Sequence, residues 1–230
     1  MLTLGCSVME TVNHLLYTRN QIPMPLAMLR QVIAKREKTS QPLIPGGKQI
    51  GRMKRDNTIK NLSIISSAIR DVFSTCRVNC VVLVLGSTIV SPKETFLISI
   101  GADVYEGTDP LVDSSNSDVL NPNGAVVRRF LRDVVTNENL NELPSLSSLQ
   151  NIQILLNLEV TCKLNDELSE IFVPKMNFHL STRGSFHSFH LTSTLNEPML
   201  DWQSILVRCN ENSTKGLWYA SKLHMKGFKE

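Results

Sequence analysis

Cys80-Val81-Val82-Leu83-Val84-Leu85 is a continuous apolar run, ended by Gly86, that decides the fold of this chain. The run has the length of a strand and is rich in valine, which favours extended backbone. Because no polar residue interrupts it, both faces of the strand are expected to be buried. The run therefore predicts a strand in the middle of a sheet, under helices.

Further strands are predicted on the C-terminal side of this run. Residues 94–100 alternate apolar with polar side chains and pair naturally with the run as a hairpin. In the second half of the chain, similar alternation predicts a long strand over residues 152–162 with one buried face. It also predicts strands over residues 172–180, 186–195 and 217–225, which we expect to be antiparallel.

Helices are predicted where apolar residues recur at spacings of three and four. They cover residues 4–20, 25–35, 56–75 and 124–137. The stretches at about residues 38–54 and 102–123 are expected to be exposed loops, because they hold Pro, Gly, Asn and Ser. The 230 residues favour a single domain over residues 1–230, of the α+β class, with helices packed on one face of a mainly antiparallel sheet.

Composition places few limits on function. Apolar residues make up 42% and charged residues 20%, and the net charge of +3 is too small to indicate nucleic-acid or membrane binding. No stretch approaches about 18 apolar residues, so no membrane span is expected. An odd number of scattered cysteines, with no secretory segment, favours reduced thiols. The cysteines are Cys6, Cys76, Cys80, Cys162 and Cys209.

Motifs for catalysis and for metal or phosphate binding are missing or incomplete in the sequence. Pro45-Gly-Gly-Lys lacks the strand–loop–helix context and the Ser or Thr that a phosphate-binding loop needs. His187 and His190 lie three apart on a predicted strand, so they would point to opposite faces and share no metal ion. No Gly-x-Ser-x-Gly elbow is present. We therefore expect no enzyme, no cofactor and no metal site.

Residues 35–60 form a basic segment, with eight positive charges against Glu37 and Asp56. Such a segment suits phosphate contacts or nuclear import, which makes a chromatin- or nucleic-acid-associated module one hypothesis. Aromatic residues that would stack on bases are absent from it. A solvated linker is the other interpretation, and the composition favours it.

The predicted helix at 124–137 is apolar over much of its circumference. One row comprises Val126, Phe130 and Val134, another comprises Val127, Leu131 and Val135, and Arg128, Arg129 and Arg132 flank them. Such a helix is either buried in a core or offers one face to a partner. Interleaved arginines suit a charged rim around a helix–helix contact. The pattern alone favours the core.

Five short segments of the chain occur together, in the same order and spacing, in one known family. They are His14-Leu15-Leu16-Tyr17-Thr18-Arg19-Asn20-Gln21-Ile22-Pro23-Met24-Pro25, Val84-Leu85-Gly86 running on to Ser91-Pro92-Lys93-Glu94, Arg128-Arg129-Phe130-Leu131-Arg132, Pro174-Lys175-Met176-Asn177-Phe178 followed by Arg183-Gly184, and Lys226-Gly227-Phe228-Lys229-Glu230. In these segments the chain resembles the comet family. Its members are HORMA-like adaptors that bind the spindle-checkpoint protein Mad-two and silence the mitotic checkpoint.

The resemblance implies a HORMA-like fold, with three helices on a β-sheet and a C-terminal segment packed on the same chain. It implies that the family's third helix, which corresponds to the predicted helix at 124–137, and the neighbouring sheet edge bind the closed form of Mad-two. The chain would present that partner to a hexameric AAA+ ATPase of the Pch-two family, which does the mechanical work. The chain itself would be a non-catalytic cell-cycle adaptor in nucleus and cytoplasm, at the spindle or kinetochore in mitosis. An exposed docking helix is also compatible with a homodimer.

The resemblance also implies which residues bind Mad-two. They are Val127, Arg128, Leu131, Arg132 and Val135 of the docking helix, together with Thr18. Leu131 stands where better-known members carry a phenylalanine, so the apolar contact is kept with less ring area. Thr18 stands where they carry a glutamine, and its side chain is too short for the same hydrogen bond.

A second set of residues would contact the ATPase. Pro174 and Lys175 match a Pro-Lys pair of the family, and Arg183 matches the turn that follows. By the alternation of the predicted strand, Lys175 points away from the buried face, as a contact residue should.

Overall fold

The structure, a computed structural model, describes residues 2–38, 48–106, 122–176, 178–181, 183–192 and 216–229. These residues form a seven-stranded sheet in the order β4-β6-β3-β1-β2-β5, with β7 paired to β3 beside β6. The strands are β1 Val78–Gly86, β2 Pro92–Ile100, β3 Asn151–Glu159, β4 Phe172–Lys175, β5 Ser185–Leu191, β6 Gly216–Ser221 and β7 Met225–Lys226.

The apolar run at residues 80–85 belongs to β1, which lies in the middle of the sheet as predicted. β2 pairs with it antiparallel as a hairpin, with Val82 opposite Leu97, and β3 pairs antiparallel on its other side. β5 is the exception, because it lies parallel to β2 at one edge of the sheet. The sheet is therefore mainly antiparallel.

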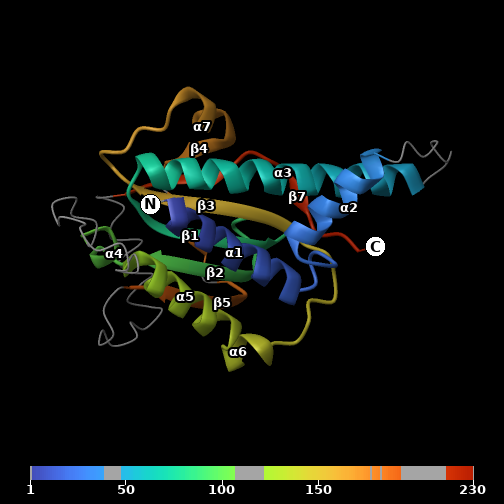
Figure 1. Cartoon of the computed structure of the whole chain (residues 1–230), viewed down its shortest axis with the longest axis horizontal. Coiled ribbons are helices and arrows are strands. Elements are labelled where there is room, and N and C mark those ends of the chain that lie inside the picture. Colours follow the sequence, from blue (N-terminus) through green and yellow to red (C-terminus); the bar gives the residue numbers. More distant parts are fainter. Residues whose placement is uncertain are drawn as a thin grey trace, which may run out of the picture.

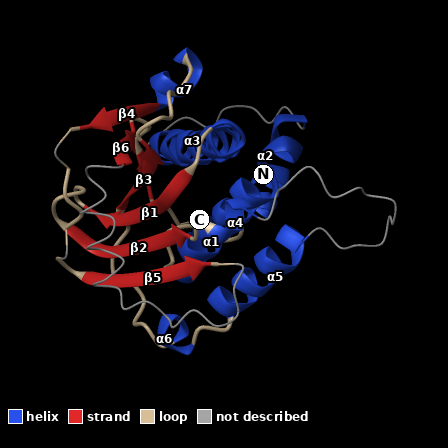
Figure 2. Cartoon of the chain, turned by 90° about the vertical axis from the view of Figure 1, so that its left-hand side faces the viewer, coloured by secondary structure: helices blue, strands red, loops and turns tan. Residues whose placement is uncertain are grey.

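Helices cover one face of the sheet (Figures 1 and 2). They are α1 Leu2–Thr18, α2 Leu26–Lys38, α3 Lys48–Thr75, α4 Asp103–Glu106, α5 Pro122–Val135, α6 Glu138–Asn141 and α7 Asp166–Ile171. α1 packs between α3 and α5, and all three contribute apolar stripes to the main core. The α+β class with helices on one face, which the HORMA-like expectation implied, is confirmed.

The second face of the sheet is also buried. Val82 and Leu155 lie in a smaller apolar cluster there with Leu180 and Trp218. Phe178 packs edge-to-face on Trp218, with 5.4 Å between the ring centroids. Residues 178–180 therefore leave the sheet edge after β4 and pass across this face, which explains why β1 is apolar on both sides.

The segment at 222–229 returns to the body of the same chain, as the resemblance implied. β7 pairs with the start of β3, and Gly227 N donates to Gln150 O at 2.9 Å. Phe228 is buried, and its backbone N–H donates to Gln21 O at 2.8 Å. These contacts close the end of the sheet over the turn that follows α1.

The two predicted loops were too long. α3 begins at Lys48, so residues 48–54 of the first predicted loop are helical, and residues 39–47 lie outside the described residues. Lys, Gln, Arg and Met are good helix formers, and the single Gly51 does not break the helix. In the second predicted loop, residues 103–106 are helical and α5 begins at Pro122. Residues 107–121 lie outside the part of the chain that the structure describes.

Several strand predictions need correction. The strand expected over residues 172–180 is β4 alone, because the chain turns at Met176 and then crosses the second face. α7, just before it, was not predicted. The strand at 152–162 ends at Glu159, and its second face is buried around Leu155 and Asn157. The strand at 217–225 divides into β6 and β7, and the strand at 186–195 ends at Leu191 as β5.

Two cysteines are joined, contrary to the expectation of reduced thiols. Cys76, just after α3, forms a disulfide with Cys162, in the turn after β3, across a Cα–Cα distance of 5.5 Å. Glu159 N donates to Arg77 O at 3.1 Å, which brings the start of β1 and the end of β3 together next to the disulfide. Cys6 is a free thiol, and Cys209 lies outside the described residues.

Candidate docking surface

α5 is a helix with one buried side and one exposed side. Pro122 stands at its start, where the fixed φ of proline suits the first helical turn. Val127, Phe130 and Val134 are buried in the main core, and the helix packs on α1 and β5. Arg132 lies in the last turn, where a cation is favourable at the negative end of the helix dipole.

The outer side of α5 presents a strip made of Arg128, Leu131, Arg132 and Val135, which we call the docking strip. Both arginines are exposed, Leu131 is half-buried against the core, and Val135 is 49% exposed. A leucine and a valine between two arginines form an apolar centre with a cationic rim. Val127 was predicted to belong to this surface, but the structure places it in the core, so its side chain supports the helix.

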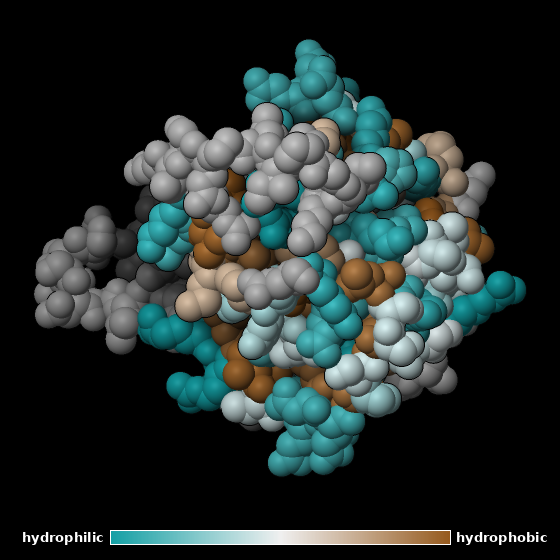
Figure 3. All heavy atoms as spheres, turned by 90° about the vertical axis from the view of Figure 1, so that its right-hand side faces the viewer, coloured by the Kyte–Doolittle hydropathy of each residue, from teal (hydrophilic) through white to brown (hydrophobic). Residues whose placement is uncertain are grey.

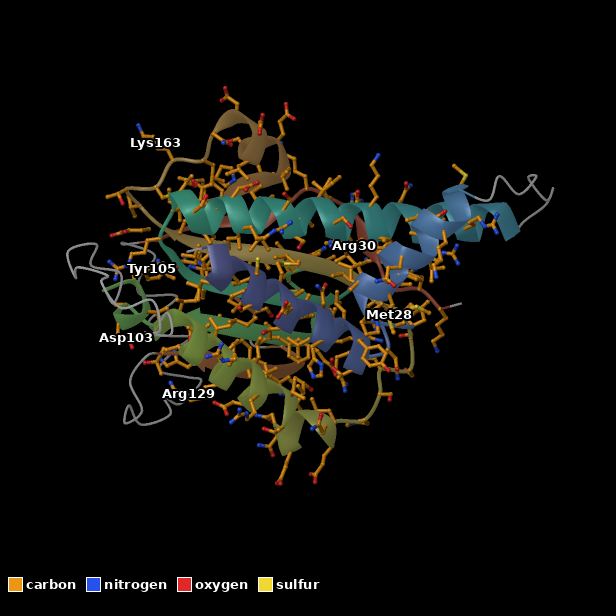
Figure 4. All side chains as sticks on the ribbon, in the orientation of Figure 1. Met28, Arg30, Asp103, Tyr105, Arg129 and Lys163 are labelled. Carbon is orange, nitrogen blue, oxygen red and sulfur yellow. A yellow bond between two sulfur atoms is a disulfide. The ribbon has the colours of Figure 1, made fainter. Side chains whose placement is uncertain are left out.

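Hydrogen bonds hold α5 in place near its middle and at its C-terminal end. Arg129 Nη2 donates to Thr192 O at 2.7 Å, and Thr192 Oγ1 donates to Asp103 Oδ2 at 2.9 Å. Arg129 and Asp103 are labelled in Figure 4. At the C-terminal end, Asn141 Nδ2 donates to Val135 O at 3.2 Å. The docking strip therefore lies on a helix that α4, β5 and α6 fix in orientation.

The end of α1, which packs beside α5, carries the remaining predicted contact residue. Thr18 is half-buried, and its hydroxyl donates within the helix, to His14 O at 3.0 Å or Leu15 O at 3.1 Å. That hydroxyl can accept a hydrogen bond from a partner but is already used as a donor. Tyr17 next to it is 44% exposed. Partial burial lowers the pKa of His14, which favours its neutral form at physiological pH.

A buried ion pair at the end of α1 was not found from the sequence. Arg19 is 2% exposed and forms a two-pronged pair with Glu94 of β2, in which Nε donates to Oε2 at 2.8 Å. Arg19 also donates to the carbonyl oxygens of Leu143 (3.3 Å) and Pro144 (2.6 Å). The pair links α1, the central hairpin and the segment after α6. No local spacing could indicate it, because its partners are 75 residues apart.

Two of the three residues predicted to contact the ATPase, Pro174 and Lys175, lie on β4, at the edge of the sheet opposite β5 and α5. Pro174 and Lys175 are both exposed. Lys175 borders a pocket of about 200 Å³ with Met176, Phe178, His179 and Trp218. Met176 is 77% exposed, so this edge offers an apolar side chain next to a cation.

Arg183 does not lie with Pro174 and Lys175. It is exposed just before β5, on the other edge of the sheet. Gly184 next to it has φ +77°, and a Cβ there would approach Lys93 O to 2.4 Å, so glycine is required where the chain enters β5. The predicted ATPase residues therefore fall into two groups, one at each edge.

The two histidines of β5 point to opposite faces, as predicted. His187 stacks on Phe96 with 5.1 Å between the ring centroids, and His190 Nδ1 lies 2.7 Å from Ser99 Oγ. Burial lowers the pKa of His187, with Glu94 opposing the shift. Within the described residues, no three His, Cys, Asp or Glu side chains are grouped as metal ligands.

Hydropathy adds one finding on membranes. Among the helices that the structure describes, none is both long and apolar enough to span a bilayer.

Comparison with known proteins places this arrangement in a family. A sequence model of the p31comet family, described by its binding of Mad1 and of Cdc20-bound Mad2 (the Mad-two above), matches residues 4–230. The chain belongs to the p31comet family. The match includes α1, α5, β4 and the C-terminal segment, which carry the residues on which the resemblance was based.

Named relatives agree with this assignment. The chain is 23% identical over 224 residues to the MAD2L1-binding protein of Mus musculus, covering 96% of this chain and 72% of that protein. It is 21% identical over 225 residues to the MAD2L1-binding protein of Homo sapiens, covering 96% and 73%. Both relatives are named as binding proteins.

Proposed function

We propose that this p31comet-family chain is a non-catalytic adaptor that binds the closed form of Mad2 through the docking strip of α5 and the end of α1. It presents Mad2 to a Pch-two-type AAA+ ATPase, which converts Mad2 to the open form and so silences the mitotic checkpoint. This activity belongs in nucleus and cytoplasm, and at the spindle or kinetochore in mitosis. The observation that carries the proposal is the family match over residues 4–230.

The docking strip supports the first part of the proposal. Its apolar centre and arginine rim are the composition of a protein–protein contact, and its helix is fixed by Arg129 at Thr192 O. Because little has to be ordered when such a helix binds, more of the contact energy becomes affinity. A second copy of the chain is the competing occupant of the strip.

The β4 edge supports the second part. Pro174 and Lys175 lie on the sheet edge opposite the docking strip, so both partners have room to bind at once. Pro174 lacks an N–H and discourages another strand from adding there, which leaves side chains to make the contact. We therefore assign ATPase contact to Lys175 and its pocket, with Arg183 as a separate contact at the far edge.

Size-exclusion chromatography with Mad2 locked in either form tests the proposal. The chain should co-elute with closed Mad2 and stay separate from open Mad2, because the docking strip is expected to recognise the closed surface. Light scattering of the chain alone is the control for self-association. Co-elution with neither form, or a stable dimer that excludes Mad2, would reject the adaptor function.

A second candidate function rests on the basic arm, which we define as residues 26–35 and 51–60 of α2 and α3. Arg30, Lys35, Arg52, Lys54 and Lys60 are exposed there, and Asp56 is the only acid among the arm's residues. Figure 3, which looks at this end of the molecule, shows hydrophilic residues interleaved with small hydrophobic areas. The excess of cations favours an anionic partner such as duplex DNA.

Salt dependence separates this candidate from a solvated surface. If the arm binds duplex DNA, affinity should fall linearly with the logarithm of salt concentration, because each neutralised phosphate releases counterions. Arg52→Gln with Lys54→Gln should reduce that slope by about one per lost phosphate contact. Arg128→Gln, on the docking strip, is the matched control and should leave the slope unchanged. Undetectable binding at low salt would remove this function.

A further inference from the structure

Residues 160–171, between β3 and β4, form a small lobe beside α3 (Figure 1). The lobe ends in α7, where Asn165 Oδ1 accepts from Leu168 N at 2.8 Å and caps the helix. Leu168 is buried in the main core, whereas Val160 is exposed. Lys163, labelled in Figure 4, is exposed as well. Leu168 therefore anchors the second half of the lobe by packing. In the first half, Cys162 and Leu164 are partly buried against the core and the other residues are exposed.

The first half of the lobe is held to the body by the Cys76–Cys162 disulfide. Cys162 is half-buried and Cys76 is buried at the end of α3. The bond closes a sequence separation of 86 residues. Cys162 N donates to Glu159 O at 2.9 Å, but that bond lies within the turn and does not reach α3. Because Cys162 is partly open to solvent, small thiols can reach it.

The lobe leads directly into the β4 edge. α7 ends at Ile171 and β4 begins at Phe172, so no linker separates them. Lys222 N donates to Ile171 O at 2.9 Å at this junction. Pro174 and Lys175 follow within the same four-residue strand. A change in how the lobe is fastened therefore acts on the strand that carries these two residues.

We propose that Cys76 and Cys162 form a reversible redox tie that fastens the lobe to α3 and thereby sets how the β4 edge is presented to the ATPase; the second half of this statement rests on the proposed function. The oxidant is a small-molecule disulfide such as oxidised glutathione. The Cys162 thiolate attacks it, forming a mixed disulfide and releasing one glutathione thiolate. The Cys76 thiolate then attacks the Cys162 sulfur and releases the second glutathione. Two thiols are oxidised and one glutathione disulfide is reduced.

Thiol trapping on the full chain tests the tie without any partner. The chain is equilibrated across ratios of reduced to oxidised glutathione, alkylated and mapped by mass spectrometry. Cys76 and Cys162 should lose alkylation together as the ratio falls, while Cys6 stays reactive after denaturation. The Tm of the oxidised form should exceed that of the reduced form by about 5–15 °C, because closing a long loop restricts the unfolded chain. Cys162→Ser should abolish this difference, and Cys6→Ser should keep it.

Binding of the ATPase tests the functional half. The oxidised chain should bind the ATPase about fivefold or more tightly than the reduced chain or Cys162→Ser, a usual size for coupling between sites. Closed Mad2, which docks on the opposite side, should bind equally to all three. Equal ATPase binding in both redox states would overturn the control of β4, and independent alkylation of Cys76 and Cys162 would overturn the tie. Loss of Mad2 binding in every form would instead reject the proposed function, since the trapping and Tm results use no partner.

Discussion

Leu131→Asp is expected to lower the affinity for closed Mad2 by about 100-fold or more, which is the cost of losing a central apolar contact of an interface. Leu131 is half-buried at the centre of the docking strip, between Arg128 and Arg132. A carboxylate there would have to be desolvated against the partner and would also pair with the rim arginines of its own helix. Isothermal titration calorimetry with locked closed Mad2 measures the loss.

Two variants guard this prediction against simple unfolding. Val135→Asp lies one turn along the strip at a more exposed position, so it should fold normally and still weaken Mad2 binding. Val127→Asp, one turn before Leu131, places the charge in the core and should unfold the chain. If the strip variants fold, as judged by circular dichroism, and bind Mad2 as the unchanged chain does, the docking assignment is wrong.

The division of α5 into core and strip shows how far the sequence can lead. Its spacing indicated two apolar rows and could not tell which one faces the sheet, because both fit a helix of 3.6 residues per turn. The structure mixes the rows: Val127, Phe130 and Val134 are buried, and Leu131 and Val135 lie on the outer side of the helix. The neighbours α1 and β5 decide this orientation, and they are distant in the sequence.

The central hairpin and the long helices were predictable because their patterns are local. The valine-rich run of β1 and the stripe of α3 each specify one element over many residues. The segment that crosses the second sheet face after Lys175 could not be predicted. Apolar residues alternate in the same way in a strand and in a chain that lies across a sheet face. The pairing of Cys76 with Cys162 likewise depends on two turns that meet only in the folded chain.

Neutralising Glu94 alone should strongly lower the free energy of unfolding, because Arg19 of the buried Arg19–Glu94 pair keeps its charge. In Glu94→Gln the guanidinium of Arg19, 2% exposed, would lose its charged partner and remain buried among the carbonyls of Leu143 and Pro144. Breaking a buried pair by removing one charge costs about 3–5 kcal/mol of the free energy of unfolding. For a chain of this length, that lowers the Tm by about 6–20 °C. Urea unfolding followed by circular dichroism measures the difference.

The reason for the loss is the unpaired charge rather than the missing attraction, and a double variant separates the two. Arg19→Met with Glu94→Leu removes both charges, so it should be closer to the unchanged chain than Glu94→Gln is, since apolar pairs often replace buried ion pairs at little cost. Asp56→Asn, which breaks the more exposed Arg55–Asp56 pair, is the matched control and should cost less than about 1 kcal/mol. A Glu94→Gln loss no larger than that of Asp56→Asn would show that Arg19 gains solvent or another partner when Glu94 is neutral. In that case the pair would not fix the end of α1. The position of α1 beside the docking strip would then depend on the packing of α1 on α5 alone.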